Sequence, residues 1–176
     1  MALGEKAASL EAETEEIYGE TYLPRKFKIA FSFEHENIID IYSNDLGFVA
    51  HFEAGKLEGF TVLAGGGMGQ SNGVKESHPR MAEPVAYIGP SEGEVMEVAR
   101  AVISIHRDFG NRENRRMARL KYILDERGVE WFKQELSSRL GRVLAPPRAL
   151  EWTRQEDYLG WHEQGDGRWF YGLHID

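Results

Sequence analysis

The chain has 176 residues, with 21 lysines and arginines against 29 aspartates and glutamates, which gives a net charge of −8. That length suits one domain, or one domain and part of another. The acidic balance argues against bulk nucleic-acid binding, which favours a basic excess. The sequence holds no run of about 18 apolar residues that would span a membrane. It has no cysteine, which excludes disulfides and thiolate-held metal clusters within this chain.

The first half of the chain has the pattern of β-strands. Residues 1–20, rich in alanine and glutamate, are predicted to form an acidic, solvated lead-in segment. Beyond Pro24, apolar side chains recur at every second position through residues 27–33, which predicts a strand with one strongly apolar face. A polar loop is expected over residues 70–80. Further extended segments are expected at residues 38–42, 48–52, 60–63 and 83–88.

The second half is predicted to be mainly helical. Apolar residues recur at helical spacing between Val95 and His106. After a break near Gly110, a second helix is expected to end before Gly128, and a third to span residues 129–140. Strands followed by helices predict an α+β fold, a mixed β-sheet covered by about three helices. A linker at Pro146-Pro147 and new strands at residues 158–162 and 169–175 follow, with Trp152, Trp161 and Trp169 as packing residues.

Arg25, Lys26 and Lys28 form the first group with chemical potential. Lys26 and Lys28 are two positions apart, so they project from the same face of the predicted strand. An ammonium is a compact charge with three donors, suited to holding a small oxyanion and supplying protons. The alternative is a solvated strand face whose lysines protect a sheet edge.

Gly65, Gly66 and Gly67 directly follow a predicted strand. Glycines allow positive φ and a close approach of the backbone to a ligand. The surrounding sequence has neither the G-x-G-x-x-G dinucleotide pattern nor a G-x-x-x-x-G-K-[ST] phosphate loop. The alternative is a flexible turn.

Residues 106–121 are basic, with six lysines and arginines against two acidic residues. Arg112, Arg115, Arg116 and Arg119 have the spacing of one stripe on a helix. Guanidinium groups match carboxylates with two parallel hydrogen bonds, and so dense a cluster repels itself unless anions offset it. The alternative is a surface helix paired with acidic neighbours.

These groups occur in an order that resembles the middle of a sirohaem sulfite reductase. The resemblance covers about residues 17–176, and its last run is similar to the ferredoxin-dependent branch in particular. The runs that carry it are residues 22–28 (YLPRKFK), 44–47 (NDLG), 59–69 (GFTVLAGGGMG), 79–84 (PRMAEP), 107–112 (RDFGNR) and 158–167 (YLGWHEQGDG).

The resemblance implies a six-electron reduction of sulfite to sulfide on sirohaem iron, with a cysteine thiolate bridging the other iron face to a [4Fe–4S] cluster. Lys26 and Lys28 match the family's catalytic lysines, which hold the anion and donate protons. The implied cofactor-binding residues are basic positions near the polycarboxylate macrocycle, the glycine run that passes close to the ring, and two polar positions in the matching runs: Arg25, Arg112, Arg115, Arg119, Gly65, Gly66, Gly67, Arg80 and Asn111.

The chain departs from the family because it has none of the four cluster cysteines. The resemblance therefore implies a fragment: a lead-in at 1–20, a central sirohaem-binding domain at 21–143, and a linker with the first strands of the next half-domain at 144–176. We expect it to contribute no metal ligand and to be inactive alone.

The implied partners are sulfite, ferredoxin and the remaining domains of the same protein, with no nucleic acid or membrane. Related nitrite reductases share the scheme, so nitrite is an alternative substrate. A catalytically silent binding or scaffold module is another alternative. The sequence shows no secretory signal, which predicts a cytoplasmic bacterial protein, with a plastid enzyme left open.

Overall fold

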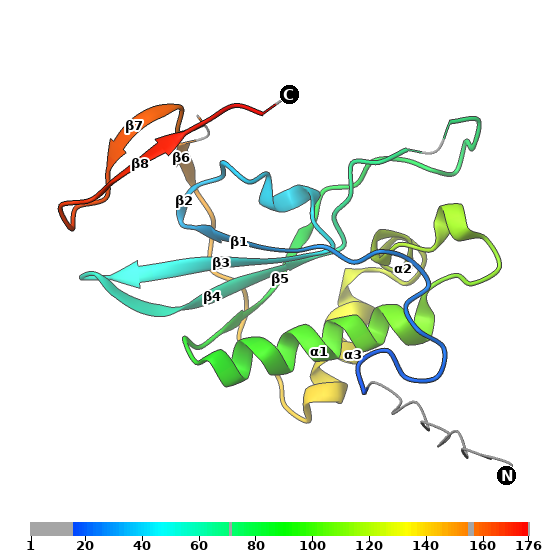
Figure 1. The fold of residues 1–176 in the computed structure, drawn as a ribbon. Helices are drawn as coiled ribbons and strands as arrows, with labels where there is room; N and C mark the ends of the chain where they lie inside the picture. The colour runs from blue at the N-terminus through cyan, green and yellow to red at the C-terminus, as the bar shows by residue number, and fades with distance from the viewer. Residues whose placement is uncertain (1–15, 71, 155–156, 176) are drawn as a thin grey trace, which may run out of the picture.

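The computed structural model describes residues 16–70, 72–154 and 157–175. Within them, a six-stranded sheet, a separate two-stranded sheet and three α-helices are present (Figure 1). Residues 1–15 of the predicted lead-in segment lie outside this range. The strands of the large sheet are β1 (Ile29–Phe33), β2 (His35–Glu36), β3 (Leu46–Glu53), β4 (Lys56–Ala64), β5 (Glu83–Ile88) and β6 (Trp152–Arg154).

The large sheet is mixed, with the strand order β5-β4-β3-β1-β2-β6. Strands β3, β4 and β5 form antiparallel pairs, and a tight turn with positive φ at Ala54 and Gly55 joins β3 to β4. The pairs β1–β3 and β2–β6 are parallel, whereas β1–β2 is antiparallel. The small sheet pairs β7 (Gly160–Glu163) with β8 (Trp169–Gly172).

The three helices are α1 (Glu92–Phe109), α2 (Leu120–Arg127) and α3 (Val129–Leu140). Ser91 caps α1 by accepting a hydrogen bond from the backbone N–H of Glu94. Gly128 separates α2 from α3, and Gly141 ends α3 in the left-handed conformation that glycine adopts without strain. The mixed sheet with three helices confirms the predicted α+β fold.

The main core lies between one face of the sheet and the helices, with α1 running beneath the sheet (Figure 1). Phe48 and Val62 of the sheet and Val98 and Val102 of α1 are fully buried there. On the opposite face, a smaller core forms around Ile41, Val49, Leu63 and Ala82, with Trp152 packed against it. Each face of the central strands is therefore covered by a different part of the chain.

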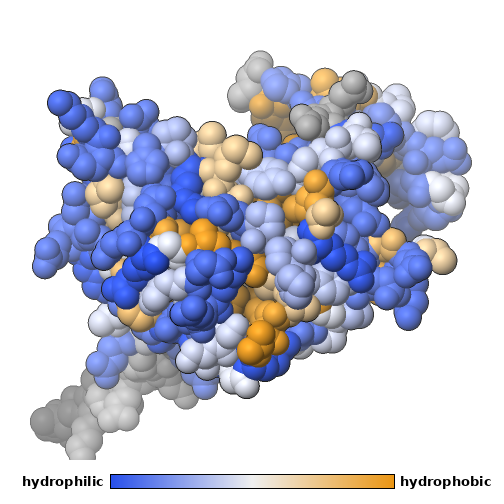
Figure 2. Space-filling model, turned by 180° about the vertical axis from the view of Figure 1, so that it is seen from behind, coloured by the Kyte–Doolittle hydropathy of each residue, from blue (hydrophilic) through white to orange (hydrophobic). Residues whose placement is uncertain are grey.

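The apolar face of β1 is exposed to solvent. Phe31 and Phe33 are 54% and 56% exposed, although the ring of Phe31 stacks on Phe48 at 5.0 Å. Ile29 and Phe52 extend this exposed apolar row. The face of the molecule turned away from the viewer in Figure 1 also has apolar patches between hydrophilic side chains (Figure 2).

The predicted strand at residues 38–42 is wrong. Asp40 has a left-handed backbone, with φ 51°, and the side-chain oxygen of Asn37 accepts the backbone N–H of Ile41 at 2.8 Å. These local bonds form a short 3₁₀ helix, η1 (Ile41–Ser43), in place of a strand. Strand β1 also begins at Ile29, so Lys26 and Lys28 lie in the segment before it rather than on it.

The helical arginine stripe is also wrong. Asn111 Oδ1 accepts the backbone N–H of Asn114 at 2.7 Å, and Asn114 Oδ1 accepts that of Arg116 at 3.1 Å. Asparagine side chains thus form turns and a 3₁₀ helix, η2 (Arg115–Met117), and α2 begins only at Leu120. These arginines have the spacing of a helix in the sequence, but in the structure they project from a turn.

After Pro147 the chain first adds β6 to the large sheet and then forms the separate β7–β8 sheet. Trp152 lies in β6 and donates a hydrogen bond from Nε1 to Tyr42 Oη at 3.0 Å. Trp161 and Trp169, expected to pack, are 69% and 60% exposed on the β7–β8 hairpin. One of the three tryptophans therefore joins a core as predicted.

Candidate functional site

A cavity of about 400 Å³ lies where the segment before β1 meets the turn before α2 and the loop between β4 and β5. Among its described lining residues, six are cationic and none is acidic. We call it the cationic cavity. It is lined by Arg25, Lys26, Gly69, Gln70, Ser77, Arg115, Arg116, Arg119, Lys121 and Tyr122. The structure therefore brings together four of the predicted site residues, Arg25, Lys26, Arg115 and Arg119.

Asp45, just before β3, fixes how these segments meet. Its side chain is fully buried and accepts hydrogen bonds from Arg119 Nε at 3.2 Å and Nη2 at 2.8 Å. The backbone N–H of Lys28 donates to Asp45 Oδ2 at 3.0 Å, and that of Gly65 donates to the Asp45 carbonyl at 2.9 Å. A bidentate guanidinium–carboxylate pair has a defined geometry. One carboxylate thus holds the lysine segment and the arginine turn together, and its own backbone carbonyl ties in the glycine run.

Gly65, Gly66 and Gly67 are closely packed against other parts of the chain, which leave no room for a side chain. A Cβ at Gly67 would overlap the guanidinium of Arg119, and one at Gly66 would overlap the carbonyl oxygen of Tyr42. Gly65 has φ +82°, and a Cβ there would lie 2.6 Å from Leu124 Cδ2. All three glycines are buried, so the run leaves room for Arg119 in the cavity lining. A direct contact between this backbone and a cofactor remains a prediction.

Arg112 and Asn111 lie outside the cavity lining and shape the approach to it. Arg112 donates to the carbonyl oxygens of Thr21 at 2.9 Å and Tyr22 at 2.7 Å. It thereby anchors the segment that leads to Arg25 and Lys26. Asn111 accepts two backbone N–H groups of the following turn. Both residues position cavity residues in this structure, and a cofactor contact by either remains a prediction.

Arg80 and Lys28 also lie outside the lining. Arg80 donates from Nη1 to the carbonyl of Gly65 at 3.0 Å and from Nε to Asp125 at 2.8 Å, and its Nη2 pairs with Glu83. Its guanidinium is thus committed to contacts within the chain. Lys28 is placed by its backbone bond to Asp45.

Sequence reasoning missed Asp45 and Lys121 as organising residues. Lys121 is 1% exposed, and its Nζ donates to the carbonyls of Gly67 at 3.0 Å and Gly69 at 2.8 Å and to that of His78. The burial of Lys121 could have been predicted, because it lies among apolar residues at the start of α2. Asp45 offered less, since its partner Arg119 lies 74 residues away.

His106 is fully buried in α1, and this burial lowers the pKa of its imidazole. Its ring is 5.5 Å from that of Phe27, and its Nε2 bonds to the carbonyl of Ala118 at 2.9 Å. Since a carbonyl only accepts, Nε2 carries the proton. His106 therefore links α1 to both segments that line the cavity and is neutral above its lowered pKa.

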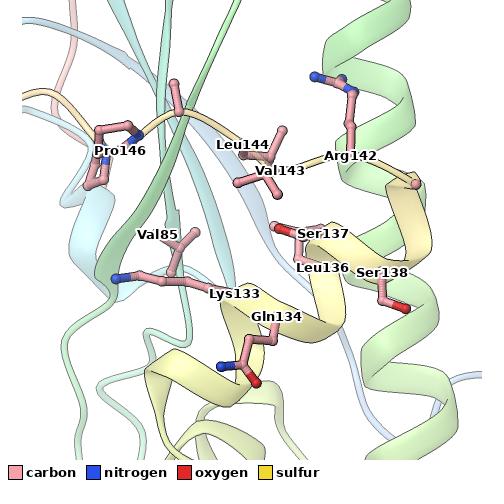
Figure 3. A pocket seen from close by; sticks show the side chains of 13 residues that line it. Val85, Lys133, Gln134, Leu136, Ser137, Ser138, Arg142, Val143, Leu144 and Pro146 are labelled. Carbon is pink, nitrogen blue, oxygen red and sulfur yellow. The ribbon is translucent and has the colours of Figure 1, made fainter.

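A second cavity, of about 690 Å³, lies between α3 and residues 141–147 (Figure 3). Its lining is mainly apolar, and it contains none of the residues predicted to bind substrate or cofactor. Lys133 and Arg142 on its rim are paired with Glu130 and with Glu94 and Glu97. Charge and residue type therefore favour the smaller cationic cavity as the functional site.

Comparison with known proteins places this geometry in a family. Residues 5–144 match the family described as "Nitrite and sulphite reductase 4Fe-4S domain".

The chain belongs to the nitrite and sulphite reductase family.

Two relatives of this family are named sulfite reductases. The "Sulfite reductase [NADPH] hemoprotein beta-component" of Myxococcus xanthus is 49% identical over 164 residues, which are 93% of this chain and 29% of the relative. The "Sulfite reductase [ferredoxin]" of Synechococcus elongatus is 43% identical over 162 residues, 92% of this chain and 26% of the relative. The chain thus spans less than a third of these relatives, and relatives of both donor classes match it.

A solved structure agrees with the family's fold. The NirA protein of Mycobacterium tuberculosis superimposes with a TM-score of 0.70 at 31% identity, over 84% of this chain and 26% of that protein. In the described part of the chain, no helix combines the length and apolar content needed to cross a membrane.

Proposed function

We propose that this chain is part of a sirohaem-dependent sulfite reductase and that the cationic cavity holds carboxylates of the sirohaem. The observation that carries the proposal is the convergence of Arg25 and Lys26 with Arg115 and Arg119 around one cavity. Family membership and the names of the relatives support it. A polycarboxylate ligand supplies the anions that this concentration of cations requires.

The donor set fits the carboxylates of sirohaem and not its iron. Ammonium and guanidinium groups hold carboxylates through charge-assisted hydrogen bonds. The chain has no cysteine for an iron–sulfur cluster, and no group of three metal-binding side chains occurs among the described residues. We therefore assign this chain part of the cofactor cradle and leave the cluster ligands to other parts of a full-length reductase.

In this proposal Lys26 and Lys28 act on the substrate. When bound, sirohaem supplies the iron at which sulfite is reduced by six electrons to sulfide. Lys26 lines the cavity, where its ammonium would hold an oxyanion and donate protons as oxygen departs. Lys28, fixed two residues further along by Asp45, would complete the pair.

The division of the chain follows the same proposal. Residues 21–143 form the central cofactor-binding domain, and residues 144–176 begin the next half-domain. The other domains of the reductase and a reduced electron donor are the expected partners. Ferredoxin remains the predicted donor, although the relatives include NADPH-dependent proteins.

Sirohaem binding to the purified chain tests the proposal. The Soret band should shift on titration, and Arg25→Met or Arg115→Met should weaken binding by about tenfold to a hundredfold, the loss of one charge-assisted contact. Lys56→Met, at the exposed start of β4, is the matched control. An unchanged Soret band, or equal affinities of all variants, would contradict the proposal.

Turnover is the second measurement. Because the cluster ligands are absent from this chain, we expect no sulfite reduction by the purified chain with reduced methyl viologen. In a full-length reductase containing this segment, Lys26→Ala and Lys28→Ala should lower sulfite turnover by about 10²–10⁴-fold, the usual loss of a general acid. Comparing sulfite with nitrite in the same assay tests the second substrate of the family. Normal rates in both lysine variants would favour a silent scaffold role.

A further inference from the structure

Lys121 is a buried cation that the proposed function does not yet use. Its side chain is 1% exposed at the start of α2, and its ammonium directs its hydrogen bonds at three backbone carbonyls, of Gly67, Gly69 and His78. Among the described residues, no carboxylate forms an ion pair with it. Buried charges are costly unless they are paired, and charged side chains are rarely fully buried without a partner.

The three carbonyls belong to both ends of one loop. Gly67 and Gly69 begin the loop between β4 and β5, and His78 lies near its end. Gly67 and Arg80 close its base through two backbone hydrogen bonds, of 2.8 and 3.0 Å. Lys121 thus binds the outgoing and the returning chain at once.

This loop forms one wall of the cationic cavity. Gln70 and Ser77 of the loop line the cavity beside Lys121 and Tyr122. Ser77 Oγ lies 3.1 Å from Tyr122 Oη, so the residue that follows Lys121 also contacts the loop. The position of the ammonium therefore couples the wall to α2.

A neutral donor would suffice to bind carbonyls, whereas an ammonium adds a charge that no carboxylate of the described chain neutralises, although it lies 4.9 Å from the ring centroid of Tyr122. We propose that Lys121 is a positioning residue of the cationic cavity, which holds the wall formed by Gly69, Gln70 and Ser77 and adds a fixed positive charge that favours a polycarboxylate tetrapyrrole. The inference rests on the proposed function. In this proposal Arg25, Arg115, Arg116 and Arg119 of the lining hold the carboxylates, and Lys121 acts behind them through its electric field and its hold on the loop.

The absence of cysteine allows this charge to be tested by itself. In Lys121→Cys, the single thiol is alkylated in denaturant and the protein is refolded. Bromoethylamine restores an ammonium of nearly the lysine length, whereas iodoacetamide gives a neutral amide that still donates hydrogen bonds. Circular dichroism and a urea transition verify that each adduct is folded.

Affinity for uroporphyrin, a metal-free polycarboxylate tetrapyrrole, is then measured by fluorescence. We expect the ammonium adduct to bind within about threefold of the unmodified chain and the amide adduct to bind about tenfold more weakly, as for one charge near an anion. The same two adducts of Lys133→Cys are the control, because Lys133 lies on α3 outside the cationic cavity. Its two adducts should bind equally.

The outcomes separate the two proposals. Failure of the unmodified chain to bind uroporphyrin would overturn the carboxylate-binding function, and the role of Lys121 with it. Binding by the unmodified chain with equal affinity for the two Lys121 adducts would overturn the role of Lys121 alone. If the amide adduct fails to refold while the ammonium adduct folds, the charge serves the fold and the inference is also overturned.

Discussion

Arg119 Nη2 lies 2.8 Å from Asp45 Oδ2, in an ion pair whose carboxylate is fully buried. The same oxygen accepts the backbone N–H of Lys28 at 3.0 Å. The distance between the arginine turn and the lysine segment is therefore set by one side chain from a third part of the chain. Both the stability and the shape of the cationic cavity should depend on Asp45.

Asp45→Asn should destabilise the chain by about 3–5 kcal/mol, because it leaves the guanidinium of Arg119 without its buried counter-charge. Urea unfolding followed by circular dichroism measures the change. Glu130→Gln is the matched control, since it breaks the exposed pair with Lys133 and should cost less than about 1 kcal/mol. Equal losses in the two variants would show that the buried pair does not stabilise the fold.

Alanine at Gly66 and at Gly67 should have different effects. A Cβ at Gly66 meets the backbone carbonyl of Tyr42, which cannot move without η1, so Gly66→Ala should lower stability by several kcal/mol. A Cβ at Gly67 meets the flexible end of Arg119, which can swing away. Because that movement disturbs the buried pair with Asp45, Gly67→Ala should lose some stability, though less than Gly66→Ala, and should also lose tetrapyrrole affinity. Urea unfolding and porphyrin fluorescence together check this, and the reverse order of effects would refute the packing argument.

Stability should fall in mild acid because burial lowers the pKa of His106 in the folded protein. In the unfolded chain its pKa is about 6.5, so the unfolded state binds the proton first. The contribution is complete above about pH 6.5 and is lost as the pH falls toward the lower folded pKa. Asp45, which raises this pKa, and Arg119 and Arg112, which lower it, are the charges that face the ring.

His106→Gln, which can still donate to Ala118, should flatten the stability profile between about pH 7 and pH 5. Glu34 and Asp108, whose pKa values are lowered by hydrogen bonds, lose their contributions only at lower pH. The two windows are therefore separable in urea titrations at a series of pH values. A variant as acid-sensitive as the original chain would assign the effect to another group.

Arg112→Met should expose the segment before β1 to proteolysis. The variant removes the donors that hold the carbonyls of Thr21 and Tyr22, so we expect cleavage after Lys26 by a lysine-specific protease to become several times faster. Arg100→Met, on the exposed side of α1, is the control. Unchanged cleavage in Arg112→Met would mean that other contacts hold the segment.

The elements that the sequence predicted well are those with a clear apolar period. The stripe from Val95 to His106 led to α1, and the spacing of Phe132 and Leu136 before Gly141 led to α3. The apolar run at residues 38–42 misled, because Asn37 and Asp40 form local bonds that no periodicity reports. Helical spacing of arginines misled for the same reason, since Asn111 and Asn114 take up the backbone N–H groups there.

The cations of the site were predictable, and their framework was not. Charge density and the family runs led to Lys26 and Arg119, which line one cavity. The ligands of Lys121 are backbone carbonyls, which have no signature in a sequence. The role of Asp45 could not be predicted, because the sequence does not show that it pairs with Arg119, 74 residues away.

The position of β6 at the edge of the large sheet affects where the chain can be truncated. The family match ends at residue 144, yet the backbone of Ala145 bonds to Tyr87 of β5 and Trp152 reaches Tyr42 across the smaller core. A version cut at the family boundary would strip the outermost strand and uncover that core. Expression variants that extend through Arg154 should therefore aggregate less than variants that end at residue 144, the limit of the family match.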